Sequence, residues 1–158
     1  MKKNLVLLGL SFVSVVYGAT PTKQPVGYNL RQFDMCFDIA ADHYKVPSNL
    51  LKAIAQTESR GNKSAINMNT NGTYDVGIMQ INSTWIPKLQ RAGIERGLLL
   101  DPCSNIQIGA WILSDNIKRY GLTNEAIGRY NSSIPAYKRQ YVMKVFSNYK
   151  KSQLADNI

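Results

Sequence analysis

The sequence has few of the side chains on which metal sites and hydrolytic triads depend. It contains two cysteines, which form no Cys-x-x-Cys pair, and a single histidine, His43. Structural zinc sites need four ligands that are mostly cysteine and histidine, and a Ser-His-Asp triad needs a histidine as its base. We therefore expect no metal, no organic cofactor and no such triad, and we expect His43 to be a surface or helix-packing residue.

A long apolar run is also absent, although a membrane-spanning helix requires about 20 apolar residues. The apolar run at residues 5–16 is shorter than that. It follows two lysines and precedes small residues around Gly18, which is typical of a cleavable secretory signal. We expect residues 1–19 to be a signal peptide and the protein to be exported. A retained N-terminal anchor is the alternative, since Tyr17 is bulky for a position so close to the cleavage site.

Internal repeats, low-complexity tracts and long linkers are missing as well. Residues 20–30 are rich in Pro, Gly, Thr and Asn and are predicted to be a flexible lead-in. Residues 31–150 are long enough to bury one hydrophobic core, and residues 151–158 are expected to be a C-terminal tail. The sequence therefore predicts a single folded domain, and we expect a monomer.

Acidic residues are scarce. Ten Asp and Glu stand against 19 Lys and Arg, which gives a formal net charge of +9. Removal of residues 1–19 takes away two lysines and no acid, so the charge falls to +7. Outside the cytoplasm, a basic surface favours anionic polymers such as cell-wall glycan with its peptide carboxylates, lipid headgroups or nucleic acid. Charge does not choose among these, but no nucleic-acid-binding motif is present, and we expect no nucleic-acid partner.

The two cysteines, Cys36 and Cys103, are expected to form one disulfide, because exported proteins fold in an oxidising compartment. The chain-entropy model assigns a closed loop of this length about 4 kcal/mol of stabilisation. Two free thiols are the alternative.

Apolar residues recur at intervals of three and four along most of the chain, which predicts about six helices. Ile39 in the first helix and Tyr137 and Tyr141 in the last are placed on the buried stripes. Asn71-Gly72 predicts a hairpin turn. The fold class is mainly α, with one small β-hairpin between the second and third helices. The expected helices are residues 33–44, 47–61, 83–91 (short or irregular because of Pro87), 102–120, 123–130 and 137–149.

Glu58 is an unusual residue for an apolar helix face. The chain beyond the expected signal has only three glutamates, and Glu58 continues the buried stripe of Leu51 and Ile54. Burial disfavours a charged carboxylate, and so does the negative end of the helix dipole, so both raise the pKa of Glu58. A carboxyl that keeps its proton near neutral pH can act as an acid. The alternative is an exposed Glu58 on the last helical turn, paired with Arg60.

Three motifs occur in order along the chain: Ala-Ile-Ala-Gln-Thr-Glu-Ser at 53–59, Gly-Ile-Met-Gln-Ile-Asn at 77–82 and Tyr-Asn at 130–131. Together they resemble the lytic transglycosylases of the soluble-lytic-transglycosylase superfamily, and an ordered set is more specific than any one motif. The short basic domain, the Asp-Pro-Cys setting of Cys103 and the Asn-Gly-Thr-Tyr-Asp run at 71–75 resemble the VirB1-like group of type IV secretion and conjugation systems. The resemblance covers roughly residues 33–149.

The resemblance implies a lysozyme-like fold and an enzyme that cuts the β-1,4 bond between N-acetylmuramic acid and N-acetylglucosamine in peptidoglycan. It makes Glu58 the catalytic acid and base, hydrogen-bonded by Tyr130. Ser132 and Ser133 depart from the family pattern, which commonly has a small residue and then Gly after Tyr-Asn, so the backbone of that loop should differ. The residues placed in the glycan cleft are Ser59, Met79, Gln80 and Asn131.

The mechanism that the resemblance implies needs one enzyme carboxyl. Glu58 would protonate the glycosidic oxygen, the substrate's own acetamido group would assist, and the C6 hydroxyl would close on C1 to give a 1,6-anhydro end. Asp75 adds a second carboxylate just past the hairpin turn. It opens a hydrolytic route, as a nucleophile or through an activated water, depending on its distance from Glu58. Alternatively, Asp75 is a turn residue that caps local backbone.

Three alternatives to a transglycosylase remain at this point. The first is a muramidase that hydrolyses the same bond with Glu58 and Asp75, and the second is a non-catalytic peptidoglycan-binding module. The third, a nucleic-acid or structural protein of a secretion apparatus, is suggested by charge alone. The expected partners are glycan strands and, from the resemblance, components of a secretion or conjugation apparatus. The expected location is the periplasm.

Overall fold

The computed structural model describes residues 29–156. The expected signal peptide, residues 1–19, and residues 20–28 of the expected lead-in lie outside this range. The last two lead-in residues belong to the folded part, because a short 3-10 helix, η1, spans Leu30–Phe33. The Asn29 side chain caps η1 by accepting a hydrogen bond from the Arg31 N–H at 2.9 Å.

The first two helices follow the sequence prediction closely. Helix α1 spans Asp34–Tyr44 and ends at Lys45, which adopts a left-handed conformation. Helix α2 spans Ser48–Ser59 and starts directly after Pro47. It ends because Arg60 and Gly61 have φ of +56° and +82°, conformations that an α-helix cannot continue.

A small antiparallel sheet follows, with strands β1 (Ile66–Met68), β2 (Tyr74–Val76) and β3 (Ile81–Asn82) in the order β1-β2-β3. The predicted hairpin is β1–β2, with Met68 opposite Tyr74. Its turn contains Gly72 at φ +80°, whose N–H bonds to the Asn69 carbonyl oxygen at 3.1 Å. The sequence did not predict β3, which is only two residues long and pairs with β2.

Two of the remaining helices start directly after a residue whose side chain caps them. Asp101 accepts a hydrogen bond from the Ser104 N–H at 2.8 Å, and Thr123 caps the next helix through Ala126. The last helix continues past residue 150, where the domain was expected to end. The helices that follow the sheet are η2 (Ser83–Trp85), α3 (Ile86–Arg91), η3 (Arg96–Leu100), α4 (Pro102–Tyr120), α5 (Asn124–Asn131) and α6 (Pro135–Asp156).

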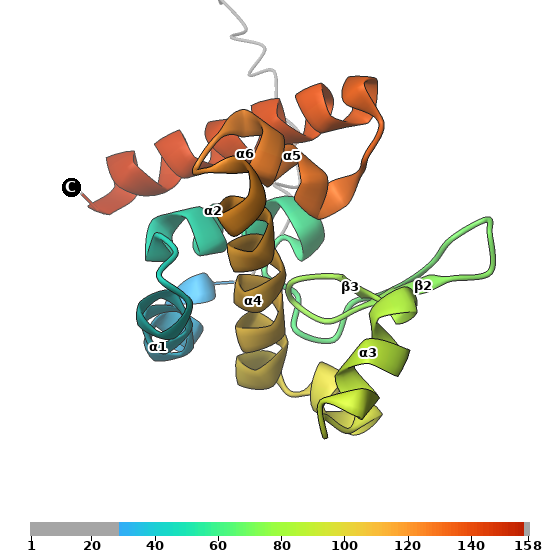
Figure 1. The fold of residues 1–158 in the computed structure, drawn as a ribbon. Coiled ribbons are helices and arrows are strands. Elements are labelled where there is room, and N and C mark those ends of the chain that lie inside the picture. The colour runs from blue at the N-terminus through green and yellow to red at the C-terminus, as the bar shows by residue number, and fades with distance from the viewer. Residues whose placement is uncertain (1–28, 157–158) are drawn as a thin grey trace, which may run out of the picture.

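Helix α4 runs through the middle of the molecule, with α1 on one side and the sheet and α3 on the other, and α6 lies across one end (Figure 1). Helix α2 packs against α6 and α1, and α4 packs against α1 and α5. The expected disulfide between Cys36 and Cys103 is present and joins α1 to the first turn of α4. The largest fully buried apolar side chains come from all of these parts: Phe37, Leu51, Ile54, Ile78, Met79, Ile81, Leu99, Ile106, Leu113 and Val145.

The mainly α fold class with one small β element is confirmed, although the sheet has three strands where a two-stranded hairpin was predicted. Two apolar side chains are wrongly placed by the periodicity. Ile39 and Tyr137 are each 55% exposed, because these helices turn that face toward solvent. No helix within residues 29–156 has the length and apolar character needed to cross a membrane.

Candidate active site

Glu58 lies in the last turn of α2, where that helix packs against α6. Its side chain is only partly accessible to solvent. The Tyr141 hydroxyl, from α6, donates a hydrogen bond of 2.6 Å to Glu58 Oε1. The packing of these two helices therefore fixes one carboxyl oxygen and leaves the other available.

Burial is the main influence on the Glu58 carboxyl, and it raises the pKa from 4.5 to about 7. The hydrogen bond from Tyr141 lowers this pKa, because it stabilises the ionised form. The negative charge of Asp75 raises the pKa, and the positive charge of Lys144 lowers it by a smaller amount. At neutral pH a large share of Glu58 is therefore protonated and able to act as an acid.

The prediction that Tyr130 hydrogen-bonds Glu58 is wrong. The Tyr130 hydroxyl donates to the Met79 carbonyl oxygen at 3.1 Å, while its ring stacks on Tyr141 with centroids 6.4 Å apart. Burial and the nearby Glu58 charge raise the pKa of both tyrosines well above 10, so both hydroxyls stay protonated as donors. Tyr141 was missed as a site residue because the sequence marked it only as one more position on an apolar stripe.

Asp75 lies on β2, and two asparagine side chains hold its carboxylate. Asn82 Nδ2 donates to Oδ1 at 2.7 Å, and Asn69 Nδ2 donates to Oδ2 at 2.9 Å. The Thr73 hydroxyl oxygen accepts from the same two amides. Asp75 is thus held by side chains from neighbouring parts of the sheet, which differs from the alternative of a backbone cap. Sequence reasoning gave neither asparagine a role, although Asn82 ends the 77–82 motif.

A cleft of about 410 Å³ joins these groups. Glu58 and Asp75 both line it, which brings together two carboxyls from different elements. Amide side chains dominate the lining, and Trp85 contributes an aromatic surface whose ring meets Trp111 edge-on at 5.5 Å. The full lining is Glu58, Asn69, Asn71, Thr73, Asp75, Gln80, Ile81, Asn82, Thr84, Trp85, Ile112, Asn116, Arg129, Tyr130 and Asn131. Such amides and aromatic surfaces suit sugar hydroxyls and sugar faces.

Two of the four predicted cleft residues line the cleft. Gln80 and Asn131 do so, and Gln80 also donates to the Gly77 carbonyl oxygen at 2.8 Å. Met79 was expected to form a cleft wall, but its side chain is fully buried in the core and only its carbonyl reaches the site, through Tyr130. Ser59 is not part of the lining.

Ser59 and the buried Asn105 hold the 77–80 turn in place. The Ser59 hydroxyl donates to the Ile78 carbonyl oxygen at 2.7 Å. Asn105 accepts from the Met79 N–H at 2.8 Å and donates to the Val76 and Leu99 carbonyl oxygens at 3.0 and 2.9 Å. No feature of the sequence distinguished Asn105 from the other polar residues of α4.

Glycine is required at Gly77 for two reasons. Its φ of +80° is left-handed, and a Cβ there would overlap the Asn105 side chain.

A fold with a mainly helical body, a small sheet and a carboxyl-lined polar cleft at their junction is the arrangement of a lysozyme-like glycan-cleaving enzyme.

Comparison with known proteins leads to the same class of enzyme. The family model described as "Transglycosylase SLT domain" matches residues 35–153. The chain therefore belongs to the transglycosylase SLT domain family, and it is a peptidoglycan lytic transglycosylase. The family expected from the sequence motifs is confirmed.

Curated relatives share this similarity over most of their length. The chain is 41% identical to "Invasion protein IagB" of Salmonella typhi over 121 residues, covering 73% of this chain and 76% of that protein. It is 41% identical to "Protein IpgF" of Shigella flexneri over 110 residues, covering 69% and 72%. It is 36% identical to "X polypeptide" of Escherichia coli over 141 residues, covering 89% and 75%.

A solved structure shares the fold. An inactive mutant of the lytic transglycosylase Slt from Pseudomonas aeruginosa matches with a TM-score of 0.62 and 20% identity. The match covers 77% of this chain and 24% of that longer chain. The small helical body and sheet seen here therefore recur as one part of a larger protein.

Proposed function

We propose that this lytic transglycosylase cuts the β-1,4 bond between N-acetylmuramic acid and N-acetylglucosamine, with Glu58 as the only enzyme group that transfers protons. The observation that carries the proposal is the Glu58 carboxyl, whose pKa burial raises to about 7 at the edge of a polar cleft. A glycosidic oxygen leaves poorly unless it is protonated, and a carboxyl neutral near pH 7 can supply that proton.

The reaction proceeds in two steps. Glu58 donates its proton to the glycosidic oxygen, while the acetamido oxygen of the muramic acid attacks C1 and replaces the departing sugar. The ionised Glu58 then accepts the proton of the C6 hydroxyl, whose oxygen bonds to C1 and releases the acetamido group. The product is a 1,6-anhydro end, and Glu58 is protonated again. Tyr141 supports the first step, because its hydrogen bond stabilises the carboxylate that forms when Glu58 gives up its proton.

Hydrolysis by a muramidase is the second candidate, and it is favoured by the presence of Asp75 in the same cleft. Mass spectrometry of the soluble fragments released from purified peptidoglycan separates the two. We expect the mature protein to release 1,6-anhydro fragments, and Glu58→Gln to release none. Asp75→Asn should lower the rate without changing the product. Reducing ends from the mature protein would instead support hydrolysis.

A non-catalytic binding module would give a third result. It would release no fragments in either the wild-type or the Glu58→Gln form, and both forms would sediment equally with insoluble peptidoglycan.

We further propose that the enzyme is exported to the periplasm and opens the wall locally for a secretion or conjugation apparatus. Support comes from the secretory pattern of residues 1–19, from the Cys36–Cys103 disulfide, which suits an oxidising compartment, and from the likeness to a relative named an invasion protein. Cell fractionation should place the mature, shortened chain in the periplasm. Deleting the gene should reduce assembly of the apparatus, and normal assembly without a redundant enzyme would contradict the proposed role.

A further inference from the structure

A series of hollows leads away from the catalytic cleft along the junction of α2 and α6. The cleft and the next hollow share Glu58 and Asn131. That hollow shares Thr57 and Lys144 with a third, and the third shares Lys151 with a fourth. Hollows that share lining residues form one continuous surface. We call the third and fourth hollows together the α2–α6 groove.

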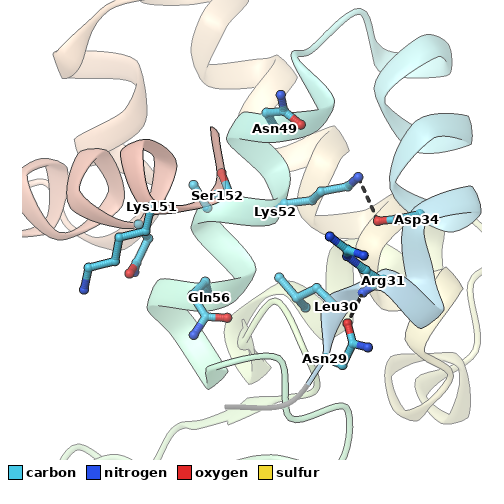
Figure 2. A pocket seen from close by; sticks show the side chains of 11 residues that line it. Asn29, Leu30, Arg31, Asp34, Asn49, Lys52, Gln56, Lys151 and Ser152 are labelled. Atoms are coloured by element: carbon cyan, nitrogen blue, oxygen red, sulfur yellow. Dashed lines mark hydrogen bonds and ion pairs between the residues drawn. The ribbon is translucent and has the colours of Figure 1, made fainter. Parts of the chain in front are cut away.

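The groove has room for an extended chain. Its two hollows measure about 530 and 400 Å³. Figure 2 shows the far one, with Lys52 and Gln56 rising from α2, Arg31 on one side and Lys151 on the other. The side chains of Arg31 and Lys151 therefore border the groove from η1 and from α6.

The groove is strongly basic. Lys52 forms an ion pair of 2.8 Å with Asp34, which is the one carboxylate in the lining. Among the side chains that the structure describes, residues 29–153, the other lining cations form no ion pair. These four are Arg31, Arg60, Lys144 and Lys151. The remaining lining is mostly amides and hydroxyls, so the groove attracts a flexible, polar and anionic ligand.

We propose that the α2–α6 groove binds the acidic peptide stem carried by the glycan strand that lies in the catalytic cleft. This inference rests on the proposed function, since it names the part of the same substrate that the cleft itself does not hold. Continuity favours the stem over an unrelated polyanion, because the groove connects with the cleft beside Glu58 through the second hollow, which shares lining residues with both. The stem carries carboxylates along its length, which match the row of cations.

The length of a stem agrees with the length of the groove. Lys52 lies about 9 Å along the α2 axis from Glu58, and Lys151 lies about 10 Å along the α6 axis from Lys144, at about 1.5 Å per residue. A stem of about four residues spans up to about 13–14 Å when extended. A carboxylate near its end therefore reaches the cations of the far hollow.

The test measures binding in the Glu58→Gln protein, which holds glycan without cutting it. Soluble glycan strands with their stems are compared with the same strands after an amidase has removed the stems. We expect the stem-bearing strands to bind about three- to tenfold more tightly, as for two or three exposed charge pairs. Adding Arg31→Gln and Lys151→Gln should abolish this preference and leave the affinity for stripped strands unchanged.

A matched control removes the same charge elsewhere. Arg91→Gln with Lys118→Gln changes one arginine and one lysine that are exposed and line none of these hollows. This pair should keep the full preference for stem-bearing strands. Circular dichroism should show that both double variants retain the wild-type helix content.

Three results would overturn the inference: equal binding of both kinds of strand, a preference that survives in the Arg31 and Lys151 variant, or a preference lost equally in the control. Binding of DNA or phosphatidylglycerol vesicles that depends on Arg31 and Lys151, without any stem preference, would also overturn it in favour of a polyphosphate ligand. The proposed function is judged separately by fragment release from the wild-type protein. A preference for stem-bearing strands without fragment release would therefore support stem binding by the α2–α6 groove and contradict the proposed cleavage reaction.

Discussion

The Glu58 carboxyl is subject to two opposing effects from its neighbours. Burial favours the neutral form and raises the pKa to about 7, while the hydrogen bond from Tyr141 favours the ionised form. Both forms are needed in one reaction cycle, the neutral one to donate a proton and the charged one to accept it. A group whose pKa lies near the working pH serves both purposes.

The pH profile of kcat/KM should therefore fall as the pH rises through about 7, because the free enzyme loses the proton that it must donate. Tyr141→Phe removes a hydrogen bond that lowers the pKa of Glu58. We expect the alkaline limb to move upward by about one pH unit and the maximal rate to fall about tenfold. Fragment release measured across pH checks both effects.

Tyr130→Phe is the matched control. It removes the same hydroxyl from a ring stacked on Tyr141, but that hydroxyl donates to the Met79 carbonyl oxygen. The alkaline limb should stay in place, although the rate can fall. An equal shift in both variants would show that Tyr141 does not act through its bond to Glu58.

The raised pKa of Glu58 also makes the fold less stable at higher pH. The carboxyl is protonated in both folded and unfolded chains below about pH 4.5 and ionised in both above about pH 7. Between these values the unfolded chain ionises first, so the free energy of unfolding decreases as the pH rises, by up to about 3 kcal/mol. Glu58→Gln removes this titration.

We therefore expect Glu58→Gln to gain stability relative to the wild type on going from about pH 4 to about pH 8, by about 2–3 kcal/mol. Urea denaturation of both proteins at each pH measures the difference. Glu95→Gln removes the same charge from an exposed position and serves as the control. A difference between Glu58→Gln and the wild type that does not change with pH would contradict burial as the cause of the raised pKa.

The turn between β2 and β3 is the element that connects the core to the cleft. Asn105 in α4 holds its backbone, and Gly77 lies against the Asn105 side chain. Tyr130 bonds the Met79 carbonyl in the same turn, and Gln80 presents its side chain to the cleft. A change at Gly77 should therefore affect both stability and activity.

Gly77→Ala and Gly72→Ala form a matched pair, because both glycines have φ of +80°. An alanine at Gly72 meets no atom within 4 Å, so it should cost only the backbone strain, about 1–2 kcal/mol. An alanine at Gly77 overlaps Asn105 as well, and should cost a further 1–3 kcal/mol, at roughly the usual scale for overpacking. Urea denaturation measures the free energy of unfolding of both variants. Equal decreases would show that the turn adjusts to the extra Cβ at Gly77 and that the overlap with Asn105 costs nothing.

Local signals predicted the helices well, because helix ends depend on a few neighbouring residues. Gly61 after α2, Asp101 before α4 and Thr123 before α5 stand where the sequence indicated. Strand β3 was missed because two residues carry no periodic pattern, and its pairing depends on β2. The three-stranded sheet is therefore a product of tertiary contact rather than of local sequence.

The site was harder to predict than the fold, since its contacts join distant parts of the chain. Glu58 could be found because a carboxyl on an apolar stripe is unusual. Its partner could not, because Tyr130 and Tyr141 are both tyrosines on helices that reach the site, and only the packing of α2 against α6 decides which hydroxyl meets the carboxyl. Asn105 likewise gained its role from a backbone turn far away in sequence.

At the scale of the whole molecule, the disulfide and the catalytic groups lie on different elements. Cys36 in α1 bonds Cys103 in the first turn of α4, with a sequence separation of 67 residues. Glu58, Asp75 and Tyr141 lie on α2, β2 and α6. The disulfide restricts the unfolded chain, and its loop encloses α2 and the whole sheet.

Replacing both cysteines by alanine should therefore lower stability by about 4 kcal/mol while largely preserving activity at room temperature. The reason is that the cross-link limits the freedom of the unfolded chain, whereas the site is held by the α2–α6 packing and by Asn105. Thermal denaturation and fragment release measure the two effects. Adding a reductant should destabilise the wild type and leave the double variant unchanged. If the double variant instead loses activity well below its melting temperature, then the disulfide between α1 and α4 also positions the catalytic cleft. The expectation that the disulfide affects stability alone would then be wrong.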